Sequence, residues 1–391
     1  MPHITASAPG KCILFGEHAV VYGHPAVAVA IDQRINVKIE TSKSGINNWK
    51  IDGLNFDPKR HPHIEALRQR LWPPALGYPP LSIHVSGQIP TASGLGSSAA
   101  LSVAASAALR AGRGRWLNHT KSDNSPQYWA EGFSSHISDT DVHSDSQPES
   151  SIRSGQLGEK VQYISGQEAV DEDECALLAH AVEAIAQGGR ASPMDSSTCC
   201  HGNVVILSDN IEPELEWMYS RTLSTPEGKR KWQIHSIDLS SDEVYLVIGN
   251  TGIHAPTSRQ VEKVAMMLKN NPERIKEIET IGLISRRGIQ SLLDEDYDSV
   301  GRAMSENQLM LKSIGVSSPE LEKLIRAAAP TSLGAKLTGA GGGGCMVALT
   351  RNPKATSEAI ELAGGRTVIS SIGANGLTLD EISDTPLHKV D

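Results

Sequence analysis

The sequence lacks the features that mark nucleic-acid, membrane and secreted proteins. No long run of Lys or Arg offers the positive surface that nucleic acid or a membrane surface would need, and the formal charge of the 391 residues is −9. No apolar run reaches the roughly 18 residues of a membrane span, and the N-terminus has neither a basic start nor an apolar signal segment. We therefore expect a cytoplasmic protein without nucleic-acid or membrane partners.

Cysteine is sparse and irregularly placed. The five cysteines form no CxxC pair and no evenly spaced framework; they stand at positions 12, 175, 199, 200 and 345. This pattern predicts neither a structural zinc site nor disulfides. With 39% hydrophobic and 21% charged residues, the composition is that of an ordinary globular protein. The length favours two domains, since a domain usually has about 100 to 200 residues.

Hydrophobic periodicity predicts an α+β chain. Short β-like runs separated by Gly and Pro turns fill the first 41 residues, and residues 81–87 alternate as a half-buried strand does. The Ala-rich segment 97–111 predicts a helix buried on most sides, and the Ser, Asp, His and Gly of 112–170 indicate a polar surface insertion. Further helices are predicted at about 171–187, 257–269, 273–293, 297–313 and 319–329, and strands at 203–208, 244–250, 345–350 and 366–372.

The strongest local signal is the segment Pro-Thr-Ala-Ser-Gly-Leu-Gly-Ser-Ser-Ala-Ala at 90–100. Gly94 and Gly96 let backbone amides approach an anion, and Ser97 opens a helix whose positive end faces the same point. A tight strand-to-helix turn is the alternative for this motif alone. A dinucleotide fold is disfavoured because no acidic residue follows about 20 positions later, and the lysine-bearing loop of P-loop proteins is absent.

Two more segments carry unusual residues. In 8–23, Ala-Pro-Gly-Lys-Cys-Ile-Leu-Phe-Gly-Glu-His-Ala-Val-Val-Tyr-Gly, an apolar stretch is interrupted by Lys11, Glu17 and His18. Taken alone, this pattern fits a Lys11–Glu17 ion pair as well as it fits catalysis. In 336–345, Lys-Leu-Thr-Gly-Ala-Gly-Gly-Gly-Gly-Cys, five glycines stand in six positions. They indicate backbone wrapped against a ligand or another loop, with a flexible turn as the alternative.

Together, and in the chain order 8–23, 90–100 and 336–345 (the first, second and third motifs), the three segments resemble the signature motifs of the GHMP kinases, the superfamily of galactokinase and of homoserine, mevalonate and phosphomevalonate kinases. Residues 16–23 are similar to the mevalonate kinases, and Gly189–Asp195 resembles the Ser-Pro-x-Asp variant of archaeal-type enzymes. The resemblance implies a two-domain α+β GHMP kinase fold. Its N-terminal domain, 1–250, would be of a kind found in ribosomal proteins, and its C-terminal domain, 251–391, would be ferredoxin-like with a tail that can pack on the first.

The resemblance also implies roles for single residues. Asp195 is expected to be the catalytic base, with Lys11 beside it. Magnesium is expected at Ser98 and Glu183. Glu183 stands twelve residues before the aspartate, whereas the family has a glutamate eleven residues before it, and one extra glycine at 188 or 189 would account for the difference. Acceptor contacts are expected from Lys11, Glu17, His18, Asp195 and Thr257. Contacts to ATP are expected from Pro90, Ala92, Ser93, Gly94, Leu95, Gly96, Ser97, Ser98, Ala99, Ala100, Gly339 and Gly341.

The implied reaction uses ATP and Mg²⁺ to phosphorylate the C5 hydroxyl of (R)-mevalonate, giving 5-phosphomevalonate for isoprenoid synthesis. The alternatives are a sister enzyme, such as mevalonate 3-kinase, phosphomevalonate kinase or homoserine kinase, and an inactive ligand sensor on the same fold. Lys11 is the only Lys or Arg before Arg34, which favours an unphosphorylated acceptor. A sensor needs no proton acceptor, so Asp195 argues against it. A homodimer stays open.

Overall fold

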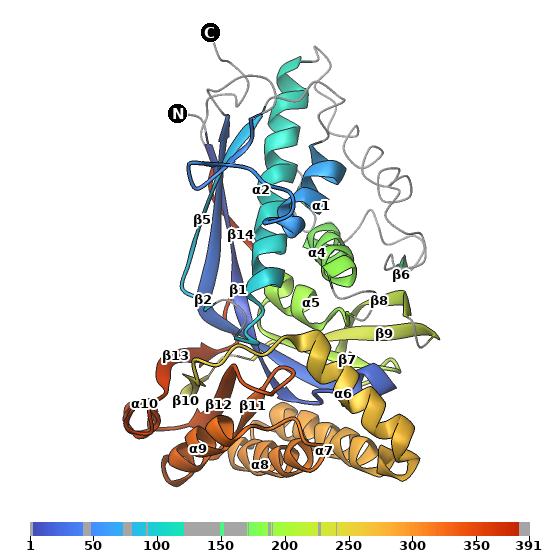
Figure 1. Ribbon diagram of the computed structural model, residues 1–391, viewed down its shortest axis with the longest axis vertical. Helices are drawn as coiled ribbons and strands as arrows, with labels where there is room; N and C mark the ends of the chain where they lie inside the picture. Colours follow the sequence, from blue (N-terminus) through green and yellow to red (C-terminus); the bar gives the residue numbers. More distant parts are fainter. Residues whose placement is uncertain are drawn as a thin grey trace.

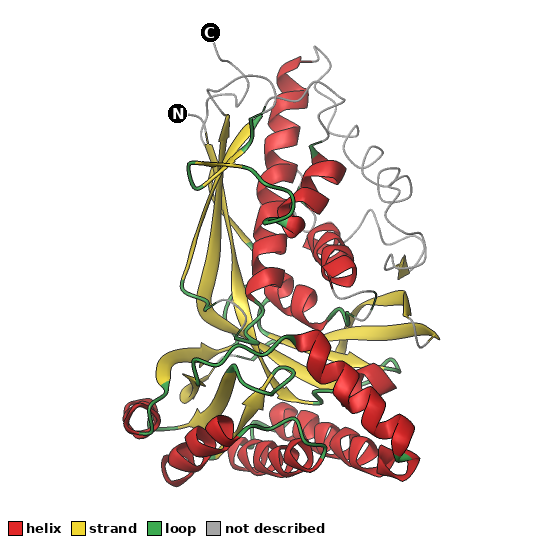
Figure 2. Ribbon diagram, in the orientation of Figure 1, coloured by secondary structure: helices red, strands yellow, loops and turns green. Residues whose placement is uncertain are grey.

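Two β-sheets with helices packed against them make up the structure, a computed structural model (Figure 1, Figure 2). It describes residues 3–41, 48–72, 80–90, 93–120, 149–151, 170, 172–186, 189, 191–225, 228–239 and 241–382. Among these residues, one sheet has ten strands and the other has four. The chain passes from the larger sheet to the smaller between β9 (Gly228–Ile237) and β10 (Ser241–Asn250). The domain bounds 1–250 and 251–391 stay a prediction.

Two long antiparallel strands, β1 (His3–Phe15) and β2 (Ala26–Thr41), form the centre of the larger sheet. Along residues 31–40 of β2, buried and more exposed side chains alternate, as in a strand with one covered face. In residues 8–15 of β1 every side chain is buried, because both faces are covered there. This double cover places the lysine at position 11 inside the protein.

The other strands of the larger sheet are β3 (Lys50–Ile51), β4 (Leu54–Asn55), β5 (Leu81–Gly87), β6 (Glu149–Ser151), β7 (Val204–Ser208), β8 (Glu216–Thr225), β9 and β14 (Thr378–Ile382). β2 pairs with β1, β5 and β7, so it connects most of the sheet. The late strand β14 pairs antiparallel with β1. The end of the described chain therefore returns to the first sheet.

Helices cover one side of this sheet (Figure 1). They are α1 (Pro62–Leu71), α2 (Ser97–Thr120), α4 (Glu172–Ala186) and α5 (Met194–His201). Residues 102–112 of α2 are buried on every side, which confirms the helix predicted there. Of the predicted polar insertion at 112–170, the structure describes the end of α2, β6 and residue 170; the rest lies outside the described residues.

The smaller sheet is antiparallel and has the order β11-β12-β10-β13. Its further strands are β11 (Gly334–Thr338), β12 (Cys345–Thr350) and β13 (Arg366–Ile372). The helices of this part are α6 (Thr257–Asn270), α7 (Ile275–Leu293), α8 (Tyr297–Ser313), α9 (Pro319–Ala328) and α10 (Pro353–Leu362), with short 3₁₀ turns η4 (Pro272–Arg274) and η5 (Ala329–Thr331). A further 3₁₀ turn, η1 (Ala19–Tyr22), lies between β1 and β2. In the described part of the chain, no helix combines the length and the apolar character that a bilayer crossing requires.

Candidate active site

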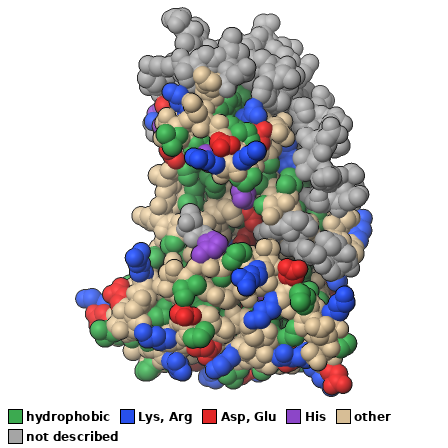
Figure 3. All heavy atoms as spheres, in the orientation of Figure 1, with side chains coloured by type: hydrophobic (Ala, Val, Ile, Leu, Met, Phe, Trp, Pro, Cys, Tyr) green, Lys and Arg blue, Asp and Glu red, His purple; other side chains and the backbone are tan. Residues whose placement is uncertain are grey.

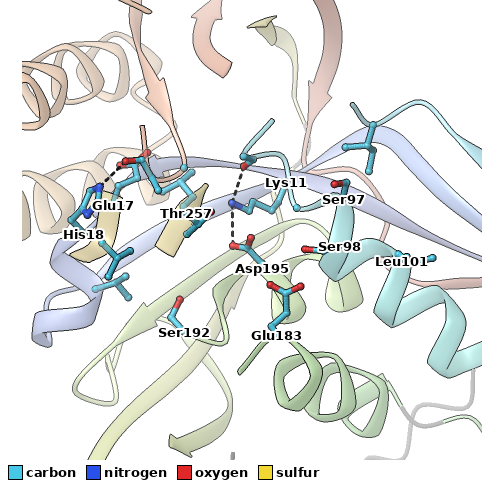
Figure 4. A pocket seen from close by; sticks show the side chains of 18 of the residues that line it. Lys11, Glu17, His18, Ser97, Ser98, Leu101, Glu183, Ser192, Asp195 and Thr257 are labelled. Atoms are coloured by element: carbon cyan, nitrogen blue, oxygen red, sulfur yellow. Dashed lines mark hydrogen bonds and ion pairs between the residues drawn. The ribbon is translucent and has the colours of Figure 1, made fainter. Parts of the chain in front are cut away.

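A pocket of about 530 Å³ lies where the part with the larger sheet meets the part with the smaller sheet (Figure 3, Figure 4). The three motifs contribute to its wall, although they are far apart in the sequence. Of the predicted site residues, those that line it are Lys11, Glu17, His18, Gly94, Gly96, Ser97, Ser98, Glu183, Asp195, Thr257 and Gly339. Those that do not are Pro90, Ser93, Leu95, Ala99, Ala100 and Gly341, while Ala92 lies outside the described residues.

An ion pair between Lys11 and Asp195 stands at the centre of the pocket. Lys11 Nζ lies 3.0 Å from Asp195 Oδ1 and also donates a hydrogen bond to the carbonyl oxygen of Gly94 at 3.0 Å (Figure 4). The lysine side chain is 3% exposed, whereas that of Asp195 is 33% exposed and opens to the pocket. Burial alone would lower the pKa of Lys11, but the adjacent carboxylate outweighs it and raises the pKa above its usual value. Lys11 is therefore a fixed positive charge.

Asp195 is held by the first turn of α5, where a carboxylate is favoured by the helix dipole. The pair that the motif alone suggested, between Lys11 and Glu17, does not form; Lys11 takes Asp195 as its partner instead. Because Asp195 is the more exposed member, it is the group of this pair that an incoming hydroxyl can reach.

The glycine-rich loop at 93–97 packs tightly on the residues around it. Gly94 and Gly96 have φ of 80° and 74°, which disfavours any residue with a Cβ. A Cβ on Gly96 would lie 3.1 Å from Lys11 Cγ, and one on Gly94 would lie 3.0 Å from the carbonyl oxygen of Thr338. A Cβ on Gly339 would in turn lie 3.2 Å from Gly94 Cα. Glycines of the second and third motifs therefore let these two loops touch beside the start of α2.

The side chains expected to hold magnesium lie on this side of the pocket. Figure 4 shows Ser98, Glu183 and Asp195 facing one space, from the first turn of α2, the last part of α4 and the start of α5. Hydroxyl and carboxylate oxygens suit Mg²⁺, which keeps waters and phosphate oxygens as its other ligands. Within the described ranges, no group of three or more His, Cys, Asp or Glu forms a preformed metal cage. The donor set fits a metal that arrives with a nucleotide.

Glu183 reaches the pocket despite the longer spacing to Asp195. Its residue is 5% exposed, and one carboxylate oxygen lies 3.7 Å from His63 Nε2 on α1. The end of α4 is closed by a 2.7 Å hydrogen bond from the amide of Gly189 to the carbonyl of Ala184, with Gly189 at φ 83°. A glycine in the left-handed region ends the helix here. The extra residue between Glu183 and Asp195 can therefore lie in the connection after α4, where it does not rotate Glu183 on the helix.

Glu17 lines the pocket, but its carboxylate is engaged with protein groups. One oxygen pairs with Nζ of the fully buried Lys336, and the other accepts a 3.0 Å hydrogen bond from Asn307 Nδ2. Burial raises the pKa of Glu17 and lowers that of Lys336, while each charge opposes the shift of the other. The predicted acceptor contact of Glu17 stays a prediction, and this geometry indicates an indirect role.

His18 follows at φ 64°, an uncommon conformation for a residue with a side chain. Its Nε2 lies 3.0 Å from the carbonyl oxygen of Ala340, and since a carbonyl only accepts, Nε2 carries the proton. Burial lowers the pKa of His18 to about 4, so the ring is neutral. The other ring nitrogen is then a hydrogen-bond acceptor. Thr257, the first residue of α6, lines the pocket near the same end.

Sequence reasoning missed part of the pocket. Ser192, three residues before Asp195, lines it, as do the apolar side chains of Ile35, Val85, Ile89 and Leu101. The serine stood in the quoted Gly189–Asp195 segment and could have been named from it. The apolar wall carries no local signal, because alternating apolar residues on a strand also face an ordinary core.

Comparison with known proteins identifies the family of the chain. Sequence profiles described as GHMP kinases N terminal domain and GHMP kinases C terminal match residues 63–139 and 289–364. A mevalonate kinase of Methanothermobacter thermautotrophicus is 30% identical over 347 residues, which cover 88% of this chain and 89% of that protein. The chain belongs to the mevalonate kinase family. A second mevalonate kinase, from Pyrococcus abyssi, is 28% identical over 98% of this chain and 100% of its own length.

Solved structures of the mevalonate kinase family show the same fold. That of Methanococcus jannaschii has a TM-score of 0.63 at 22% identity and covers 95% of this chain and 99% of its own. The L. major mevalonate kinase in complex with R-mevalonate has a TM-score of 0.61 at 19% identity, covering 95% and 96%. The predicted family and the two-domain GHMP kinase fold are thus confirmed.

Proposed function

We propose that this protein transfers the γ-phosphoryl group of ATP to the C5 hydroxyl of (R)-mevalonate, giving 5-phosphomevalonate and ADP. The observation that carries the proposal is the Lys11–Asp195 pair, joined at 3.0 Å and facing the glycine-rich loop. Phosphoryl transfer asks a protein chiefly to align the nucleophile with the γ-phosphate and to balance charge. The pocket brings groups for each of these tasks together.

Asp195 accepts the proton of the acceptor hydroxyl as the oxygen attacks phosphorus. The new O–P bond forms while the bond between the γ-phosphorus and the bridging oxygen breaks, and ADP leaves with that electron pair. Lys11 has a raised pKa and stays charged, so it stabilises the negative charge on the attacking oxygen. Its hydrogen bond to Gly94 O keeps the ammonium between the base and the phosphate loop.

The start of α2 supplies the phosphate site. Amides of the 93–97 loop and the positive end of a long helix favour the ATP phosphates at Ser97 and Ser98. Mg²⁺ held by Ser98 and Glu183 would neutralise phosphate charge when bound. His18 and Thr257 line the part of the pocket where mevalonate binds. There the neutral ring of His18 accepts a hydrogen bond from a hydroxyl group of mevalonate. A cytoplasmic location, the lack of nucleic-acid and membrane partners, and a homodimer remain expectations.

The test is ATP-dependent phosphorylation by the purified protein of (R)-mevalonate, 5-phosphomevalonate, homoserine and galactose in parallel. Phosphorus NMR of the product identifies the oxygen that receives phosphate. We expect transfer to the mevalonate C5 hydroxyl. Phosphate on C3 or on another acceptor would replace the substrate, and ATP binding without any transfer would support an inactive sensor.

A further inference from the structure

The two carboxylates of the proposed site come from neighbouring helices, α4 and α5. Their connection spans residues 187–193, of which the structure describes 189 and 191–193. The position of Asp195 beside Lys11 depends on where this connection enters α5. A side chain that fixes the connection would therefore act on catalysis without touching substrate.

His180 makes such a contact. It lies on α4, is fully buried, and its Nε2 is 3.0 Å from the carbonyl oxygen of Ala191. The carbonyl can only accept, so Nε2 carries the proton and donates. Burial lowers the pKa of His180 to about 4, which leaves a neutral ring with that single proton. The geometry therefore fixes the tautomer, and the neutral ring donates this hydrogen bond at neutral pH.

The carbonyl of Ala191 needs this donor. Ala191 is 3% exposed and packs in an apolar cluster with Ala184, Met194 and Trp232. A buried carbonyl without a donor costs about 1–3 kcal/mol, so the segment would move if the histidine were apolar. Ser192 follows at once in the pocket wall, and Asp195 begins the next helix.

The same ring also contacts the first motif through a tryptophan. His180 and Trp232 meet edge to face at a centroid distance of 6.3 Å. Trp232 Nε1 donates a 3.2 Å hydrogen bond to the carbonyl oxygen of Val20, a residue of η1 that lines the pocket. Glu183 stands three residues after His180, on the same side of α4. One buried imidazole therefore stands between three parts of the site.

We propose that His180 is a positioning residue for phosphoryl transfer, whose hydrogen bond to Ala191 holds the segment leading to Asp195 so that the carboxylate stays beside Lys11. This inference rests on the proposed function. It assigns the residue no contact with ATP, metal or acceptor. Loss of this hydrogen bond should lower kcat and leave substrate binding nearly unchanged, because other contacts hold α4 and the glycine-rich loop in place.

The test compares His180→Phe and His180→Met, which remove the donor, with His180→Gln, whose amide can still donate. The matched control is His235→Phe on β9: His235 is also fully buried, its Nε2 accepts from the amide of Glu212 at 3.0 Å, and it lies outside the pocket wall. A shift of about 1 Å can cost about 100-fold in rate, so we expect the donor-free variants to lose about 10- to 100-fold in kcat. KM values for ATP and mevalonate should stay within about threefold.

His180→Gln should recover kcat to within about threefold of the unmodified enzyme, and His235→Phe should lower only the melting temperature. Hydrogen exchange gives a readout that needs no activity: the peptide covering 189–199 should exchange faster in the donor-free variants and not in His235→Phe. Unchanged kcat in both donor-free variants, equal loss in His180→Gln, or unchanged exchange would overturn the inference. If the unmodified protein transfers no phosphate, the proposed function fails, and exchange alone decides whether His180 holds the segment.

Discussion

The buried Glu17–Lys336 pair allows a sharp stability prediction. Lys336 is 0% exposed and its ammonium pairs with Glu17 Oε1, while it also donates to the carbonyl oxygens of Ile13 at 3.3 Å and Leu337 at 2.5 Å. The pair joins the turn that follows β1 to β11, and these two strands belong to different sheets. Removing one member leaves the other charge buried without its partner.

We expect Lys336→Met to destabilise the protein by about 3–5 kcal/mol, the usual cost of breaking a buried ion pair from one side. The double variant Glu17→Gln with Lys336→Met should recover part of this loss, because no charge remains without a partner. The control is Lys312→Met, which breaks the exposed pair with Glu322, whose N–O distance is 3.0 Å and whose lysine is 59% exposed. That change should cost about 0–1 kcal/mol.

Urea unfolding followed by circular dichroism and tryptophan fluorescence measures these differences. The pH dependence provides a second check on Lys336→Met. Without the lysine, burial holds the folded-state pKa of Glu17 above its unfolded value, so the stability of the folded state is greatest at low pH and falls as pH rises through the folded pKa. The deficit of the variant should therefore shrink as the pH falls from the folded-state pKa of Glu17 toward the lower pKa of the unfolded chain. A cost below about 1 kcal/mol, or a double variant as unstable as the sum of the singles, would refute this reasoning.

Three further outcomes follow from the structure. Gly96→Ala places a methyl group 3.1 Å from Lys11 Cγ at φ 74°, so we expect kcat/KM to fall about 10- to 100-fold, as steady-state kinetics will show. Glu183→Gln should raise the Mg²⁺ concentration needed for half-maximal rate at least tenfold, whereas Glu174→Gln on the same helix should leave it unchanged, measured by metal titration. Arg34 donates to the carbonyl oxygens of Asn375 and Gly376 at 2.8 and 2.7 Å, so Arg34→Met should loosen the C-terminal segment and speed hydrogen exchange across 375–382 without changing the KM for ATP.

The sequence predicted those elements whose pattern is local and strong. The helix at 97–111 was found because its Ala-rich run favours a helix, and those at 257–269 and 297–313 were found because their apolar periodicity runs over several turns. The hairpin of β8 and β9 was missed. Its residues are rich in Arg, Lys, Ser and Thr, and their burial depends on the pairing of β9 with β7 and β8 rather than on an alternation visible in the segment.

The site was predictable as three separate motifs, and the pairing between them was not. Lys11 and Glu17 looked like partners because they are six residues apart, yet the partner of Glu17 lies 319 residues away in β11. Only the fold brings these charges together. The residue types of a phosphate loop and a base can be read from the sequence, while the buried lysine and the donor at His180 depend on which strands and helices become neighbours.

Asp195→Asn tests the central claim most directly, because the amide has the size of the carboxylate and cannot take the acceptor proton. We expect kcat with (R)-mevalonate to fall about 100- to 10,000-fold, the range that a general base contributes, while calorimetric affinities for ATP and mevalonate stay within about threefold. If the variant keeps more than about a tenth of the original kcat, Asp195 is not the base and the proposed mechanism is wrong.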